Sequence, residues 1–385
     1  MNERLRVFVT DPAYHEDRVE GFLRVTEHGD PAQARLLHAR RHGAADWPSF
    51  LAYLQALASG RAREPFLEAF EAMKHGAWDR LSVLLERQPD LARARGTNGN
   101  TLLNLGVSLA ASSCASLPPP ALDLFERLLR TGDVNEANDR GWTPLHQAAY
   151  ANAVPLVGRL LGAGADPSLE AYGEGGTPLA VALFWGHREA ADVLAARAVL
   201  PSNLRIAAGL GRLDLIRRCF SEDGGLTEEA KRGRGFYRPH TGFPAWQPSP
   251  APREVLDEAL VWAAKAGRVD VLPELVARGA DVNADPYRGT PLAWAAANGR
   301  RAAASWLIDH GADVNRAATF GGPGHGERVT ALHLAAQADQ VGLVRLLLDR
   351  GADSRLTDAL YGGTPAGWAE HEGATGALAL LTGRG

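Results

Sequence analysis

The sequence predicts an all-α fold: a solenoid of stacked helix-turn-helix units, preceded by a small helical segment. Two observations lead to this prediction. A Thr-Pro-Leu motif recurs at Thr143, Thr177 and Thr290, and a Gly-Ala-Asp motif recurs between its copies, as at Gly164 and Gly311. The intervals between neighbouring copies vary around a value of about 33 residues, the period of a helical repeat. A length of 385 residues exceeds one ordinary domain, and a repeat array accounts for it.

Residues 1–65 do not follow the repeat, and we expect them to form a helical N-terminal segment. Amphipathic patterns predict short helices over residues 18–24 and 31–41, separated by the turn-forming run Gly29-Asp30-Pro31. A third helix is expected over residues 48–57, where Pro48 suits the first turn. Packing against the first repeat is the simplest role for this segment.

The repeat array is expected over residues 66–385, in about nine units. The first unit lacks the Thr-Pro pair and the last is truncated, so both are interpreted as the caps that a solenoid needs for solubility. The predicted units begin near residues 67, 101, 143, 177, 202, 258, 290, 330 and 364.

Each motif has a physical role in a helix pair. At Thr143-Pro144, threonine suits the N-cap, and proline suits the first helical turn, where its missing N–H has no intrahelical partner to lose. Gly186 is expected to end its helix in a left-handed turn. The second helices carry apolar residues at helical spacing, as at Val344 and Leu347. One unit cannot bury this apolar face alone, so the units are predicted to stack.

The motifs resemble those of the ankyrin-repeat family over about residues 66–385. The copies that carry the resemblance are Thr143-Pro144-Leu145-His146, Thr177-Pro178-Leu179, Thr290-Pro291-Leu292 and Thr330-Ala331-Leu332-His333. The helical segment before them resembles the leader found before many bacterial ankyrin arrays.

The resemblance implies helix pairs joined by hairpin-like loops. It further implies that partners bind the concave face, which is made by the hairpin tips and the ends of the first helices. The same resemblance implies that His146 and His333 are structural residues, hydrogen-bonded to loop backbone.

Composition excludes several classes of protein. Apolar residues make up 45% and charged residues 22%, the balance of a folded chain, and the net charge of −4 argues against a nucleic-acid or anionic-membrane binder. The two cysteines, Cys114 and Cys219, rule out a disulfide framework and suit a reducing cytoplasm. Neither a signal peptide nor a transmembrane run is readable. We therefore expect a cytoplasmic monomer without a cofactor.

Two insertions interrupt the period, at about residues 221–252 and 317–329. The first crowds four basic residues, four aromatic residues and four prolines into residues 231–250. Long loops in compact arrays are usually functional or disordered, and Tyr, Trp and Arg are enriched in binding hot spots. Both insertions are expected to leave the stack at the hairpin end, where they can meet over residues 285–288. The interpretation that competes with a recognition site is a loop that folds over the edge of the solenoid. The basic run at residues 231–238 is weak evidence for nucleic-acid binding, because a short basic run is usually a solvated loop.

Candidate partner-binding residues lie at hairpin tips, near the ends of first helices or in the two insertions. For each of them singly, packing in the core or at its rim is an equal alternative. The candidates are Arg140, Trp142, Tyr150, Phe184, Trp185, Tyr237, Arg238, His240, Trp246, Tyr287, Arg288, Phe320, His325, Tyr361 and His371. By contrast, Trp262, Trp294 and Trp368 occupy one equivalent position inside the first helix and are expected in the stack.

The function that these observations favour is a non-enzymatic scaffold that binds another protein through the concave face and the 221–252 insertion. No catalytic or metal site is predicted, because no cysteine pair has zinc spacing and no nucleophile motif is present. The alternative is a small-ligand or metal-dependent enzyme with a composite pocket between the insertions, around Tyr237, His240, Tyr287, Arg288 and His325. Self-association through the aromatic residues of the first insertion is a third possibility.

Overall fold

The computed structural model describes residues 9–25, 30–42, 44–96, 98–112, 118–171, 173–237, 248–319 and 327–383. Over these ranges the chain forms α-helices and short 3-10 turns, with isolated bridges in place of strands. The predicted all-α class is confirmed. None of the described helices is long and apolar enough to cross a membrane.

Three helices precede the array: α1 (Pro12–Val25), α2 (Pro31–Arg41) and α3 (Trp47–Ala58). The second and third agree with the sequence prediction, and their N-caps are aspartates, as where Asp46 accepts the backbone N–H of Ser49 at 2.8 Å. The first helix begins well before the predicted residue 18, because Asp11 accepts the N–H of Ala13 at 3.0 Å and opens the helix there.

Within the described ranges, helices α4 to α21 follow as nine pairs, in agreement with the prediction of about nine units. Each pair is named here by its first and second helix. The pairs are α4 (Pro65–Lys74) and α5 (Trp78–Arg87), α6 (Leu102–Ser112) and α7 (Pro119–Thr131), α8 (Pro144–Tyr150) and α9 (Val154–Gly162), α10 (Pro178–Phe184) and α11 (Arg188–Ala195), α12 (Leu204–Leu210) and α13 (Leu213–Arg218), α14 (Pro252–Ala266) and α15 (Leu272–Ala277), α16 (Pro291–Ala297) and α17 (Arg301–Asp309), α18 (Ala331–Gln337) and α19 (Val341–Asp349), and α20 (Pro365–Glu372) and α21 (Thr375–Leu381).

The threonine and histidine of the motif act together at the start of the first helix. In α18, the backbone N–H and hydroxyl of Thr330 lie 3.2 and 2.9 Å from Nδ1 of His333, and the other ring nitrogen lies 3.1 Å from the carbonyl oxygen of Gly363. His146 and Thr143 repeat the arrangement in α8. Both histidines are fully buried, which confirms their structural role.

The Gly-Ala-Asp motif joins one unit to the next through an asparagine. The side chain of Asn283 donates to the carbonyl oxygen of Gly311 at 2.9 Å and accepts the N–H of Asp313 at 2.8 Å. Asn315 makes the same pair of bonds one unit later, to Gly351 and Asp353. We call this series of bonds the asparagine ladder. Because both bonds end on backbone atoms, they fix the spacing between consecutive hairpins.

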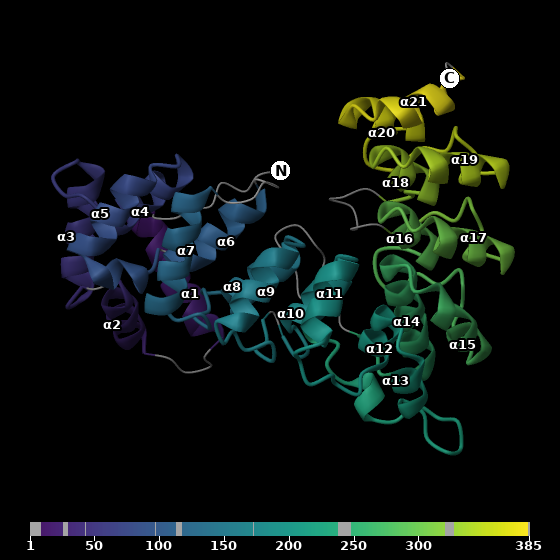
Figure 1. Cartoon of the computed structure of the whole chain (residues 1–385), viewed down its shortest axis with the longest axis horizontal. Helices are drawn as coiled ribbons and strands as arrows, with labels where there is room; N and C mark the ends of the chain where they lie inside the picture. Colours follow the sequence, from purple (N-terminus) through teal and green to yellow (C-terminus); the bar gives the residue numbers. More distant parts are fainter. Residues whose placement is uncertain are drawn as a thin grey trace. The chain divides into compact units, whose positions relative to one another are not determined.

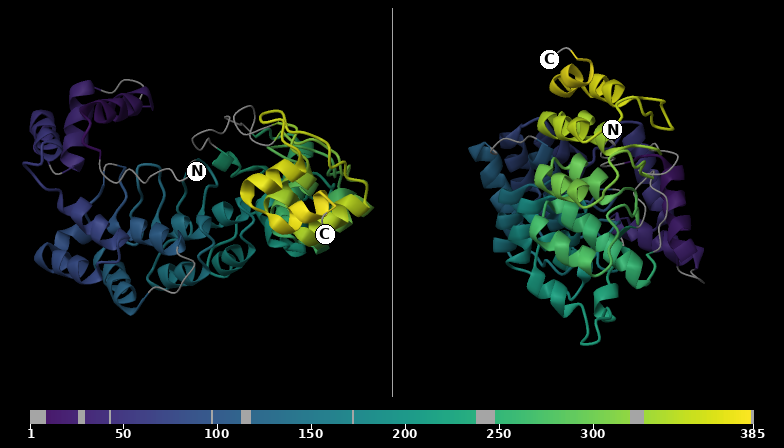
Figure 2. Two further views of the ribbon diagram at one scale, coloured as in Figure 1. Left: turned by 90° about the horizontal axis from the view of Figure 1, so that it is seen from above. Right: turned by 90° about the vertical axis from the view of Figure 1, so that its right-hand side faces the viewer.

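The chain divides into two compact units: unit 1 holds residues 1–151 and 158–166, and unit 2 holds residues 152–157 and 167–385. In unit 2 the pairs from α12–α13 to α20–α21 stack in chain order, as Figures 1 and 2 show. One apolar core runs through this stack from Leu204 to Ala377. The predicted boundary between residues 65 and 66 stays a prediction.

Truncating a side chain of this shared core will destabilise unit 2. Leu307 in α17 is fully buried between neighbouring pairs, so Leu307→Ala is expected to lower the free energy of unfolding by about 2–5 kcal/mol. Val199 is 97% exposed, and Val199→Ala is expected to change the free energy of unfolding by no more than about 0.5 kcal/mol. Urea unfolding followed by circular dichroism measures both values, and equal effects would contradict the shared core.

Candidate binding surface

The first insertion is partly folded against the array. Residues 229–231 and 235–237 form the 3-10 turns η2 (Glu229–Lys231) and η3 (Gly235–Tyr237). The N–H of Gly235 donates to the carbonyl oxygen of Glu174 at 2.9 Å, and Phe236 is 2% exposed. The prediction that the insertion leaves the stack is therefore wrong for this part. Helix α14 also begins at Pro252, before the predicted unit start near residue 258, because proline opens its first turn.

Three buried charges hold this part of the insertion in place, and we call them the ion cluster: Arg205, Arg234 and Glu258. Nη1 of Arg205 lies 2.8 Å from Oε1 of Glu258, and Nε of Arg234 contacts the other carboxylate oxygen. All three side chains are at most 3% exposed. The interpretation of the basic run as a solvated loop is wrong at Arg234, since its charge is neutralised inside the protein.

Arg205 also recognises the backbone of the insertion. Its Nη2 donates to the carbonyl oxygen of Gly233 at 2.7 Å, and its guanidinium carbon lies 4.5 Å from the ring centre of Trp262. Arg234 reaches a second carboxylate, with Nη2 at 3.2 Å from Oε1 of Glu254. Helices α12 and α14 are thus joined to the insertion by charge-assisted hydrogen bonds, which are about twice as strong as neutral ones.

A buried lysine lies next to this cluster, at the end of α14. Lys265 is 2% exposed, and its Nζ donates to the carbonyl oxygen of Phe184 at 2.7 Å. The same nitrogen lies 3.5 Å from the ring centre of Trp294 and 4.6 Å from that of Phe184. Burial lowers the pKa of Lys265 well below its ordinary value; Arg288 lowers the pKa further, and Glu258 raises it.

Four of the predicted partner-binding residues come together above this lysine. The ring of Phe184 lies 5.2 Å from that of Trp185 and 6.3 Å from that of Tyr287, and the guanidinium of Arg288 lies 5.7 Å from the Tyr287 ring. Phe184 and Arg288 are 3% and 6% exposed, so they are buried beneath the surface of the site and do not form part of that surface. Tyr287 and Trp185 are half-buried and present the accessible edges. Burial also raises the pKa of the Tyr287 phenol, against an opposing effect of Arg288.

Tyr361, at the hairpin tip before α20, is the most exposed of the aromatic side chains in the predicted set whose exposed fraction is known. Its side chain is 78% exposed, and that of Leu360 is 41% exposed. The carboxylate of Asp358 holds the tip, because Oδ1 accepts the N–H groups of Leu360 and Tyr361 at 2.8 and 2.7 Å. Oδ2 accepts the N–H of Gly363 and the indole N–H of Trp368, both at 2.9 Å. A single buried carboxylate therefore fixes a turn that exposes an aromatic side chain.

The remaining predicted residues are placed as follows. In unit 1, Arg140 and Tyr150 are exposed, whereas Trp142 is 6% exposed and packs edge-to-face against Tyr150 at 5.5 Å. His371 is exposed on α20. Burial of Trp262 and Trp294 confirms their place in the stack, and Trp368 is half-buried.

The proposed composite pocket is not tested, because His240 and His325 lie outside the described ranges and the side chain of Tyr237 is not described. The backbone of Tyr237 ends η3, but the position of its side chain is not described. The sequence-predicted residues outside the described ranges are Arg238, His240, Trp246, Phe320 and His325.

Sequence reasoning missed two clusters that depend on distant residues. The ion cluster joins residues separated by up to 53 positions, and no local pattern pairs them. The second cluster consists of His15, His38 and His42, whose ring nitrogens converge in the N-terminal helices. Its one local signal is the spacing of four between His38, in the helix predicted over residues 31–41, and His42 directly after it.

Removing the shared carboxylate of the ion cluster will destabilise unit 2 strongly. Glu258→Gln keeps the volume but removes the negative charge that two buried guanidinium groups share, and only Arg234 has a second carboxylate described, that of Glu254, so a loss of about 3–5 kcal/mol is expected. Glu254→Gln makes the same change one helical turn away, at a side chain 27% exposed, and should cost about 1 kcal/mol or less. Urea unfolding compares the two variants, and similar losses would refute the role of Glu258.

The buried amine of Lys265 predicts a pH dependence. Folding lowers the pKa of Lys265 below its ordinary value of 10.5. Between the lowered and the ordinary value, the Lys265 amine therefore carries its proton more often in the unfolded chain than in the folded chain. The contribution of Lys265 to stability therefore rises with pH up to about that value. Lys265→Met removes this dependence, so the stability advantage of the variant should be greatest near neutral pH and shrink toward pH 10. Urea unfolding of both proteins between pH 6 and 10 measures the difference between their free energies of unfolding. A difference that stays constant over this range would contradict a lowered pKa of Lys265 in the folded protein.

Comparison with known families agrees with the geometry. A family model described as ankyrin repeats in three copies matches residues 113–202 and 250–318, and a model of the single ankyrin repeat matches residues 328–359. No curated protein matches the chain significantly. The matched segments coincide with consecutive helix pairs, with the capped first helices and with the asparagine ladder. The chain therefore belongs to the ankyrin-repeat family.

Proposed function

We propose that this chain is a non-enzymatic scaffold that binds another protein through its concave face and the 221–252 insertion. Ankyrin repeats generally act as protein-interaction modules. The concave face is taken here as the hairpin tips with the ends of the first helices. The proposal places a monomer in the cytoplasm, in keeping with a chain that contains two cysteines and buries Cys219 as a free thiol.

The observation on which the proposal rests is the Tyr361 tip. Tyr361 is 78% exposed and its neighbour Leu360 is 41% exposed, so the tip offers two adjacent large side chains to a partner. Tyrosine is enriched among residues that dominate binding energies, since it buries a large ring and keeps a hydroxyl for hydrogen bonding. Its position at a hairpin tip is where the family resemblance locates partner contacts.

The tip is also organised before binding. Asp358 fixes the backbone N–H groups of Leu360 and Tyr361, and the N–H of Ala359 donates to the carbonyl oxygen of Glu327 at 2.8 Å. The end of the second insertion thus braces the tip. Ordering a free loop on binding costs affinity, at about 0.5–1.5 kcal/mol for each immobilised side chain, and a fixed turn avoids much of that cost.

The first insertion contributes in a second way. The ion cluster anchors residues 233 and 234 onto α12 and α14, and the ring of Phe236 in the same segment lies 5.3 Å from that of Phe184. An anchored segment adds a contact surface of defined position and not a freely moving tail. We propose that it selects among partners, whereas Tyr361 supplies affinity.

Replacing the exposed ring should remove partner binding without loss of fold. Proteins captured from a native lysate by the full chain are compared with those captured by Tyr361→Ala and Val199→Ala. Both variants truncate an exposed side chain of unit 2. A partner retained by wild type and Val199→Ala should bind Tyr361→Ala at least about 30-fold more weakly, the loss of a hot spot of about 2 kcal/mol.

The affinity for the captured partner is measured by calorimetry with purified proteins. Replacing residues 231–250 by a Gly/Ser linker tests the insertion, after circular dichroism has shown that the variant folds. Equal affinities for wild type and Tyr361→Ala would contradict the role of the tip, and unchanged selectivity in the linker variant would remove the insertion from the site.

A further inference from the structure

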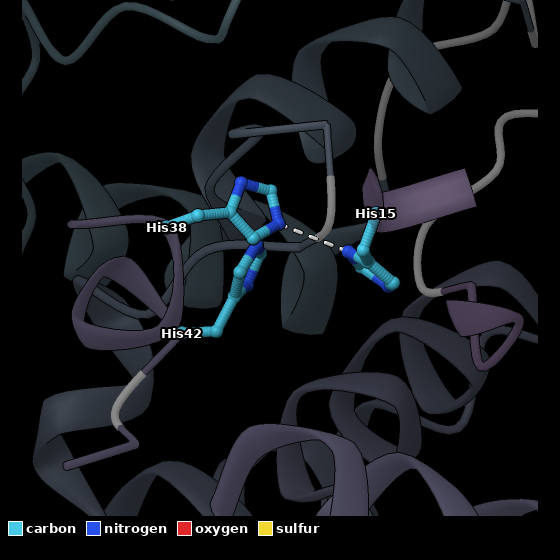
Figure 3. Close-up of side chains that lie close together, drawn as sticks. All are labelled: His15, His38 and His42. Carbon is cyan, nitrogen blue, oxygen red and sulfur yellow. Dashed lines mark hydrogen bonds between the residues drawn. The ribbon is translucent and has the colours of Figure 1, made fainter. Parts of the chain in front are cut away.

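Three histidines of the N-terminal helices direct ring nitrogens toward one point (Figure 3). His15 belongs to α1, His38 to α2, and His42 is the C-cap residue of α2. Nδ1 of His15 lies 3.0 Å from Nε2 of His38, and one ring nitrogen from each of the three side chains lies within 4.8 Å of the other two. Residues four apart on a helix share a face, so α2 presents two imidazoles to the one from α1.

These separations suit a transition-metal ion. With zinc–nitrogen distances of about 2.0–2.1 Å, two ligands of a tetrahedral site lie about 3.3 Å apart. The 3.0 Å separation between His15 and His38 needs to widen only slightly to reach that value. The remaining nitrogen–nitrogen separations are at most 4.8 Å, so metal binding requires them to shorten by up to about 1.5 Å, through rotation of the half-buried rings of His38 and His42.

His15 is oriented as a metal ligand is usually oriented. Its Nε2 lies 2.8 Å from the carbonyl oxygen of Val9, which can only accept, so the proton is on Nε2 and the lone pair of Nδ1 faces the other two rings. A hydrogen bond from the far ring nitrogen to a backbone carbonyl is the common support of zinc-bound histidines. Burial lowers the pKa of His15, against smaller raising effects of Val9 and Asp11, and this favours the neutral ring that a metal requires.

The walls of the cluster are aromatic. Phe50 of α3 is fully buried; its ring stacks on that of His42 at 5.1 Å and meets that of His15 edge-on at 4.9 Å. Trp47 lies 5.8 Å from His38. A hydrophobic shell of this kind restricts the rotamers of the ligands and limits access of water.

We propose that His15, His38 and His42 bind one Zn²⁺ ion, with water in the fourth position. Three imidazoles suit zinc better than magnesium or calcium, which prefer oxygen ligands. The ion joins α1 to the end of α2. Helix α1 in turn contacts the array, because Nη2 of Arg18 lies 3.3 Å from Oδ2 of Asp139 in the hairpin loop before α8. Zinc therefore sets the position of the helix that contacts this hairpin of unit 1.

Zinc titration of the full chain tests the proposal. The protein is prepared without a histidine tag, freed of metal with a chelator and titrated with Zn²⁺ against a chromophoric competitor. Wild type is expected to bind one ion per chain, and His38→Gln and His42→Gln should each bind at least about tenfold more weakly. His75→Gln is the matched control, since His75 is an exposed histidine at the end of another unit 1 helix.

X-ray absorption of the zinc complex provides a readout that does not depend on how the variants fold. The expected spectrum shows about three imidazole nitrogens at about 2.0–2.1 Å from the metal. Absence of stoichiometric binding, equal affinity in wild type and both ligand variants, or a spectrum without imidazole ligands would overturn the proposal. Unchanged zinc affinity in His75→Gln together with the two losses would support it.

Discussion

The structure of the array depends on one constraint: no helix pair can bury its own apolar face. In unit 2 the alanines and leucines of each pair complete their contacts only on the next pair, so the core from Leu204 to Ala377 is shared along the stack. Stability is then the sum of many interfaces between neighbours. The asparagine ladder and the threonine–histidine caps support this shared core, because they hold neighbouring units at the spacing that the core requires.

The first insertion shows how such a stack accommodates an irregular segment. The regular units are joined by apolar contacts, hydrogen bonds and exposed ion pairs such as Arg350–Asp309, whereas residues 233 and 234 are held by the buried charges of Arg205 and Glu258 from two consecutive pairs. A buried ion pair is a poor source of net stability but is costly to break. Here it ties a long interruption to a defined place, beside the buried amine of Lys265. Irregular sequence and buried charge thus occur together at the centre of unit 2.

Local patterns in the sequence predicted most of the fold, because helix caps, proline positions and left-handed glycines act within a few residues. The nine units, the helices at residues 31–41 and 48–57, and the structural role of His146 and His333 could be read in this way. The early start of α1 at Pro12 and of α14 at Pro252 was missed, although both begin with proline at the first turn.

The candidate sites were less predictable, because they are made by residues far apart in the chain. The hairpin tip at Tyr361 is an exception: it could be located from the repeat frame, and Asp358, three residues earlier, is a local turn signal that was overlooked. The burial of Arg234 depends on Glu258, and the convergence of His15 on His38 depends on how two helices pack. Spacing along a sequence carries no information on such pairings unless both partners lie in the same element.

The asparagine ladder has a consequence for how arrays of this kind change in length. Each asparagine forms hydrogen bonds only with a backbone carbonyl oxygen and a backbone N–H of the following hairpin, as Asn283 does at Gly311 and Asp313. Such a connection is indifferent to which side chains the next unit carries. A whole unit that keeps the Gly-Ala-Asp hairpin can therefore be duplicated or lost by recombination, with its neighbours still in register. Binding surfaces on the hairpin tips can diverge freely while the joints between units stay the same.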